Sequence, residues 1–87
     1  MEYRVAVIGI IVENPDAVDP LNALLHEYAA HIIGRMGIPH KARGISIISI
    51  TVDAPQDVIS ALSGRIGRLS GVTAKTAYSS LKYEEKA

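Results

Sequence analysis

Two stretches of the chain, residues 3–13 and 45–53, are apolar at both alternating sets of positions. Successive side chains of a β-strand point to opposite faces, so these stretches need cover on both faces. In the first stretch, Val5, Val7 and Ile11 share one face, and Ala6, Ile8, Ile10 and Val12 share the other. In the second, Ser46, Ile48, Ile50 and Val52 alternate with Ile45, Ile47, Ser49 and Thr51. We therefore predict two central strands of one sheet.

An amphipathic helix is expected after each central strand. Apolar residues recur at three- and four-residue steps in both segments: Val18, Leu21, Leu25, Tyr28 and Ile32 in the first, and Val58, Leu62, Ile66 and Leu69, with Ile59 alongside, in the second. Asn14 or Asp19 can cap the first helix, since each precedes a proline. That helix should end before Gly34. The second helix should begin near Pro55 and end before Gly71.

Two further strands complete the pattern. Residues 33–39 hold two glycines and a proline, which suits a short edge strand. Residues 40–44 form a polar hairpin connection, and residues 72–79 form the last strand. The order βαββαβ predicts an α+β ferredoxin-like fold, with a four-stranded antiparallel sheet and two helices on one face. We expect one domain over residues 1–80 and a charged C-terminal tail over residues 81–87.

Two helices on one face leave the other face of the sheet uncovered. Since the central strands are apolar on that side too, a partner is needed, and in this architecture we expect a second copy of the chain, in a dimer or a tetramer. Nine Lys and Arg balance nine Asp and Glu, so the formal net charge is zero. A neutral chain offers little electrostatic resistance to self-association.

Composition excludes several uses of this fold. The chain has no cysteine, which removes disulfides, iron–sulfur ligation and thiolate metal sites. It has no Phe or Trp, so the stacking rings of an RNA-recognition sheet are missing. The longest apolar run, residues 5–12, is far shorter than the ~20 residues that span a bilayer. Without a signal-peptide pattern either, we expect a cytoplasmic protein that does not contact membranes.

No motif for catalysis, metal or cofactor is evident. His26 and His31 are five residues apart, which places them about 140° apart around a helix, so they should not share an ion. Asp53 and Asp57 are explained by capping of the second helix. Residues 63–68 contain glycines and arginines but lack a Walker lysine. We predict no catalytic residue, no bound metal and no cofactor, hence a protein that is not an enzyme.

A small basic cluster leaves DNA binding open as an alternative. Arg35, Lys41 and Arg43 lie close in sequence. One subunit with three basic residues should bind DNA weakly, although an oligomer could add several such patches together. A protein-binding adaptor without any small ligand is a further alternative.

Several segments carry a resemblance to a known family. A strand that ends in Val-Glu-Asn-Pro (residues 12–15) resembles the ACT domain, a ligand-sensing regulatory module. Residues 25–28, 34–39, 61–67 and 70–76 are similar to the iron-only hydrogenase system regulator family. The fold is also similar to the C-terminal domain of the nickel-responsive repressor. That repressor's nickel site includes a cysteine, which this chain lacks, so the site is not expected here.

The resemblance implies a stand-alone ACT-like regulator that senses a small molecule as a homo-oligomer. ACT-type sites use the loop after the first strand and the adjoining start of the helix. In this chain that loop nominates Glu13, Asn14 and Asp16 as ligand-binding residues.

Overall fold

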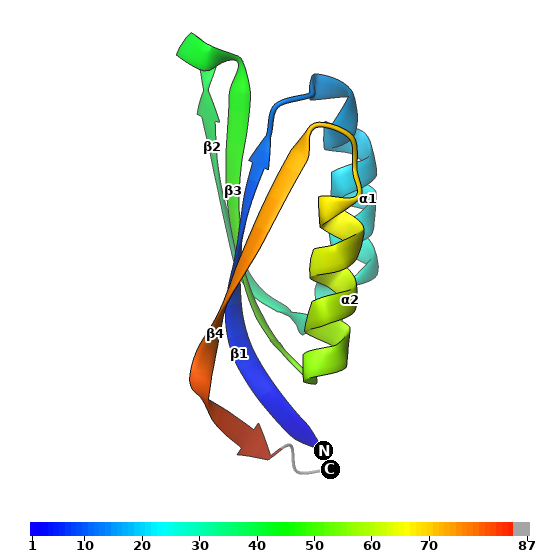
Figure 1. Ribbon diagram of the computed structural model, residues 1–87, viewed down its shortest axis with the longest axis vertical. Coiled ribbons are helices and arrows are strands. Elements are labelled where there is room, and N and C mark those ends of the chain that lie inside the picture. Colours follow the sequence, from blue (N-terminus) through cyan, green and yellow to red (C-terminus); the bar gives the residue numbers. More distant parts are fainter. Residues whose placement is uncertain (85–87) are drawn as a thin grey trace.

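The computed structural model of the chain describes residues 1–84 and contains one antiparallel sheet with two helices. The strands are β1 (Glu2–Val12), β2 (Ile32–His40), β3 (Ile45–Ala54) and β4 (Val72–Glu84). The helices are α1 (Val18–Glu27) and α2 (Gln56–Gly67), with short 3-10 turns at residues 15–17, 29–31 and 41–43. The strand order is β2-β3-β1-β4, and both helices lie on the same face of the sheet (Figure 1). The predicted α+β ferredoxin-like fold is confirmed.

The core lies between the sheet and the two helices. β1 and β3 contribute every second side chain to it: Ala6, Ile8, Ile10, Val12, Ile48, Ile50, Val52 and Ala54. The helices contribute Leu21, Leu24, Leu25, Ile59, Leu62 and Ile66. Each of these side chains is less than a tenth exposed. The helix-facing sides of β1 and β3 are therefore those that the alternation predicted, and apolar burial on this side stabilises the fold.

The first helix is shorter than its apolar spacing predicted. α1 ends at Glu27, a 3-10 turn follows, and Ile32 is the first residue of β2, where it pairs with Val52. Ile32 still packs against the core. The three- and four-residue spacing of apolar residues continues past the helix because the turn returns the chain to the same core. Periodicity alone therefore placed the C-terminal end of the helix too late. At the other end of α1, Val18 is 36% exposed, contrary to its predicted burial.

β4 is longer than predicted. It continues past Ser79 to Glu84, and its final residues pair with the start of β1: Arg4 with Lys82, Tyr3 with Tyr83 and Glu2 with Glu84. The register shifts between Arg4 and Ala6. Two residues along β1 correspond there to four residues along β4, from Lys82 to Tyr78. This bulge lets the polar end of the chain remain in the sheet. Residues 81–84 of the predicted tail thus belong to β4, and residues 85–87 lie outside the described residues.

Among residues 1–84, neither helix combines the length and the apolar content that crossing a bilayer requires.

The turn between α2 and β4 lies directly against the loop that follows β1. Gly71 has φ 75°, in the left-handed region that favours glycine, and an added Cβ atom would lie 2.4 Å from Cβ of Asn14. The backbone N–H of Glu13 donates a hydrogen bond to the carbonyl of Gly71 at 2.8 Å. The glycine predicted to mark the helix exit is therefore also required by a close approach of two loops.

We expect Gly71→Ala to lower the free energy of unfolding by at least about 2 kcal/mol, because both the positive φ and the contact with Asn14 oppose a side chain. Gly34→Ala is the matched control, since nothing lies within 4 Å of an added Cβ there and its φ is ordinary. Urea denaturation of the two variants measures the difference. Equal stability of the two would contradict the steric argument.

Candidate functional site

One face of the sheet is turned away from the helices. This open face is apolar at its centre. Its exposed apolar residues include Val7 and Ile11 of β1, each about two fifths exposed, and Ile47 of β3 at 38%. On the edge strand β2, Met36 and Ile38 are 61% and 52% exposed. The register aligns Ile38, Ile47 and Ile11 across three neighbouring strands. Apolar residues of three neighbouring strands are therefore exposed side by side on this face.

The open face carries two opposite charges on its strands. Lys75 of β4 aligns with Gly9 and Ser49, and Asp53 of β3 aligns with Val5. One carboxylate oxygen of Asp53 is buried without a hydrogen-bond partner. A face with one cation, one anion and an apolar centre can complement a rotated copy of itself.

The predicted ligand residues Glu13, Asn14 and Asp16 lie in the loop between β1 and α1. The side-chain oxygen of Asn14 accepts a hydrogen bond from the backbone N–H of Asp16 at 3.1 Å, which caps the 3-10 turn. The Asn14 amide nitrogen donates to the carbonyl of Ser70 at 3.4 Å. Asn14 was one of two predicted caps, and it caps the turn rather than α1 itself. Asp19 lies within the first turn of α1.

The structure separates the three residues by environment. Glu13 and Asp16 are exposed, whereas Asn14 is half-buried and holds the loop against the α2–β4 turn. The nearby cavity of about 210 Å³ is lined by neighbours of the loop, including Val12, Pro15 and Val18, and by residues of the β2–β3 hairpin. A ligand-binding role for Glu13, Asn14 and Asp16 stays a prediction.

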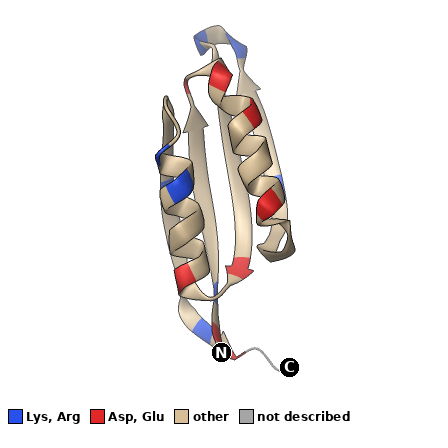
Figure 2. Cartoon of the chain, turned by 90° about the vertical axis from the view of Figure 1, so that its right-hand side faces the viewer, with Lys and Arg blue, Asp and Glu red and all other residues tan. Residues whose placement is uncertain are grey.

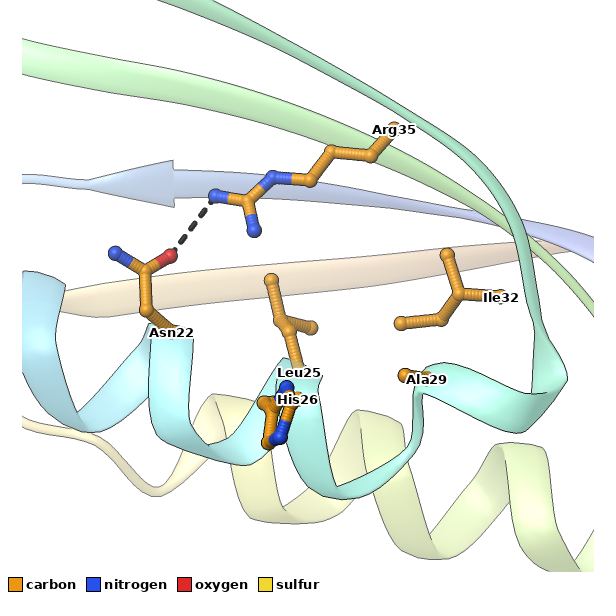
Figure 3. Close-up of a pocket in the computed structure, with 6 residues that line it drawn as sticks. All are labelled: Asn22, Leu25, His26, Ala29, Ile32 and Arg35. Atoms are coloured by element: carbon orange, nitrogen blue, oxygen red, sulfur yellow. Dashed lines mark hydrogen bonds between the residues drawn. The ribbon is translucent and has the colours of Figure 1, made fainter.

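A groove that the sequence did not reveal runs between α1 and β2. Its first cavity, of about 380 Å³, is lined by Asn22, Leu25, His26, Ala29, Ile32 and Arg35. Arg35 reaches from β2 toward α1 and donates a hydrogen bond to the Asn22 side-chain oxygen at 2.8 Å (Figure 3). The alternation of β2 could have indicated that Arg35 faces the helices, but only the packing of α1 shows how it meets Asn22.

The residues that suggested a DNA-binding cluster are separated by the fold. Lys41 and Arg43 lie in the 3-10 turn at the tip of the β2–β3 hairpin, at the upper end of the molecule (Figure 2). Arg35 lies in the groove with Asn22. The histidines are separated as well. His26 lines the groove, while His31 lines a different cavity with Tyr3 and Asp53. Within the part of the chain that the structure describes, no three His, Asp or Glu side chains are grouped to hold a metal ion.

An ion pair connects α1 and α2 at the outer surface of the helix layer. Arg65 of α2 donates to both carboxylate oxygens of Glu27 of α1 and to the hydroxyl of Tyr28 at 3.3 Å. Its guanidinium also lies 5.6 Å from the centre of the Tyr28 ring. Hydrogen bonding to Arg65 holds the pKa of Glu27 below its usual value. This contact links the two helices at their exposed surface and gives Arg65, within the segment 63–68, a structural role.

We expect Arg65→Gln to return the pKa of Glu27 toward its ordinary value, because the charged donor is lost. Since folding lowers this pKa, the ion pair stabilises the protein above the unfolded-state pKa, and the contribution disappears as the pH falls through the folded-state pKa. Carboxyl NMR titration measures the shift. Arg68→Gln is the control, and an unchanged Glu27 titration in Arg65→Gln would refute the assignment.

The sheet order and the two helices on one face define a small α+β protein of the ferredoxin-like class. The TM1266-like family, described as "Iron-only hydrogenase system regulator, putative", matches residues 4–76, and the chain belongs to this family. The structure of the protein TM1266 from Thermotoga maritima is similar at 34% sequence identity and a TM-score of 0.84, and the match covers 87% of this chain and 96% of that one. The predicted family resemblance is confirmed.

A more distant structural match shows the fold alone. A formyltetrahydrofolate deformylase from Pseudomonas putida KT2440 shares 12% sequence identity with a TM-score of 0.60. The match covers 83% of this chain but only 28% of the deformylase chain. None of the curated proteins matches the chain.

Proposed function

We propose that this chain is a regulatory protein of the iron-only hydrogenase system that has no catalytic activity, acts in the cytoplasm, assembles with copies of itself and responds to a small ligand. The family description supports the regulatory role. The observation that carries the proposal is the open face, where Val7, Ile11 and Ile47 remain exposed at the centre of the sheet. Burying this apolar surface is the favourable term that a partner would gain.

A second copy of the chain fits the open face by charge as well as by hydrophobicity. Strand spacing of about 4.8 Å and a rise of about 3.3 Å per residue place Lys75 and Asp53 about 16 Å apart, on opposite sides of Val7. A two-fold axis in the plane of the interface, across Val7, would bring Lys75 of each copy over Asp53 of the other. Such an isologous contact satisfies both charges at once.

We expect Val7→Glu to convert the oligomer to a monomer, because two carboxylates would face each other at the apolar centre of the interface. Ala61→Glu is the matched control, since it adds the same charge to the exposed surface of α2. Analytical ultracentrifugation at micromolar concentration measures the mass, and circular dichroism checks that both variants remain folded. A native chain that is already monomeric, or an oligomer that survives Val7→Glu, would refute self-association through the open face.

The β1–α1 loop is the proposed place for the small ligand. Glu13 and Asp16 present exposed carboxylates there, and Asn14 orders the loop backbone between them. Native mass spectrometry of protein purified without chelator or affinity metal should show the oligomer with a discrete added mass. A ligand-free oligomer would instead favour the protein-binding adaptor, and DNA binding requires a mobility shift that weakens steeply with salt and with Arg35→Ala and Arg43→Ala.

We expect the double variant Asn14→Ala, Asp16→Ala to lose that added mass while keeping the oligomeric state, since the loop contacts lie away from the open face. Asp19→Ala is the control, because Asp19 is an exposed carboxylate on α1 just beyond the loop. Retention of the ligand by the double variant would refute the loop assignment. Asn14→Ala alone should also cost about 1 kcal/mol of stability through the lost cap, so unfolding is measured in parallel.

A further inference from the structure

The α1–β2 groove is a chain of three cavities that share lining residues. The first cavity and a second of about 290 Å³ share Asn22 and Arg35. The second shares Val18, Pro39 and Ser46 with the cavity beside the β1–α1 loop. Asn22 and Arg35 thus lie at the junction of a groove that follows α1 along most of its length.

Charge in the groove has one sign. Arg35 lines the first and second cavities and Lys41 lines the third, and no Asp or Glu is among the lining residues of the three. Within residues 1–84, Arg35 forms no ion pair with a carboxylate, and its side chain bonds only to the neutral Asn22. In a chain whose formal net charge is zero, this groove holds a local excess of positive charge.

The hydrogen bond between Arg35 and Asn22 leaves donors available. Arg35 uses one terminal nitrogen on the Asn22 oxygen, so the rest of its planar fork can still donate. The Asn22 oxygen accepts from Arg35, and the Asn22 amide nitrogen can donate to a further partner. A guanidinium fork beside an amide donor matches a planar carboxylate, which it can bind with two parallel hydrogen bonds.

The surroundings of these donors are apolar and roomy. Leu25, Ala29 and Ile32 lie beside Arg35 in the first cavity (Figure 3). Leu25 is only 3% exposed, so the floor of the cavity is firmly packed. On β2, an added Cβ at Gly37 would meet nothing within 4 Å, so this wall of the second cavity is open. A volume of about 380 Å³ is enough for a compact organic molecule.

We propose that the α1–β2 groove binds a small organic carboxylate with a compact apolar body. Its carboxylate is held by Arg35 and Asn22, with His26 as a third polar neighbour, and its apolar body packs on Leu25, Ala29 and Ile32. The site lies in the first and second cavities, which Glu13, Asn14 and Asp16 do not line, and on the side of the sheet opposite the open face. It goes beyond the proposed function, because the groove residues belong to one copy and binding does not need self-association.

The test is an NMR titration of isotopically labelled protein with benzoate, compared with benzamide, which has the same shape without the charge. We expect benzoate to shift the amide signals of residues 22–26 and 32–35, with benzamide binding at least about tenfold more weakly. Arg35→Gln should weaken benzoate binding by a similar factor. Arg43→Gln removes an equal charge at the hairpin tip and should change the affinity less than twofold.

Arg35→Lys separates charge from geometry. It keeps the cation but loses the planar fork, so an affinity between those of the native chain and Arg35→Gln is expected. The proposal is overturned if the shifted signals lie outside the groove, if benzamide binds as well as benzoate, or if Arg35→Gln binds like the native chain. The Val7→Glu variant should bind benzoate unchanged, so a failed titration refutes the groove site alone, and loss of the oligomer leaves it intact.

Discussion

The antiparallel pairing of β1 with β3 governs the rest of the molecule, because both strands carry apolar side chains on both faces. On one face, Ile8, Ile10 and Ile50 are fully covered by the helices. On the other, Val7, Ile11 and Ile47 keep about two fifths of their surface exposed. Two helices connected by right-handed crossovers can cover only one face. The open face therefore follows from the way the chain is connected, and with it the proposal that a second copy supplies the missing cover.

The same arrangement explains the groove. β2 lies at the edge of the sheet, and each of its residues is exposed or half-buried. α1 packs on the centre of the sheet with Leu21, Leu24 and Leu25, so the helix-facing side of β2 stays partly open to solvent. Arg35 and Asn22 meet across that opening. The open face and the groove are thus two consequences of one small helix layer on a wider sheet, and they lie on opposite sides of it.

The fold could be predicted well because the alternation in residues 3–13 and 45–53 is unambiguous and glycine or proline borders most elements. The errors lie at the ends of the helices and strands. Ile32 continued a helical rhythm although it begins β2, and residues 82–84 looked like part of a charged tail although they pair with β1. The site could be predicted only in part. Asn14 was singled out as a cap, although it caps the 3-10 turn before α1 and not the helix, and its contact with Ser70 and the crowding at Gly71 join loops 56 residues apart.

The sequence by itself determined the element order, the two-faced central strands and the family, since alternation, turn residues and short motifs are local properties. It also excluded thiolate metal sites, because the chain has no cysteine. Only the tertiary structure decided which charged residues are neighbours. It brought Arg35 to Asn22 and Arg65 to Glu27, and it separated Arg35 from Lys41 and Arg43. The physical reason is that side-chain contacts between elements depend on how α1 and α2 pack on the sheet, which no local pattern specifies.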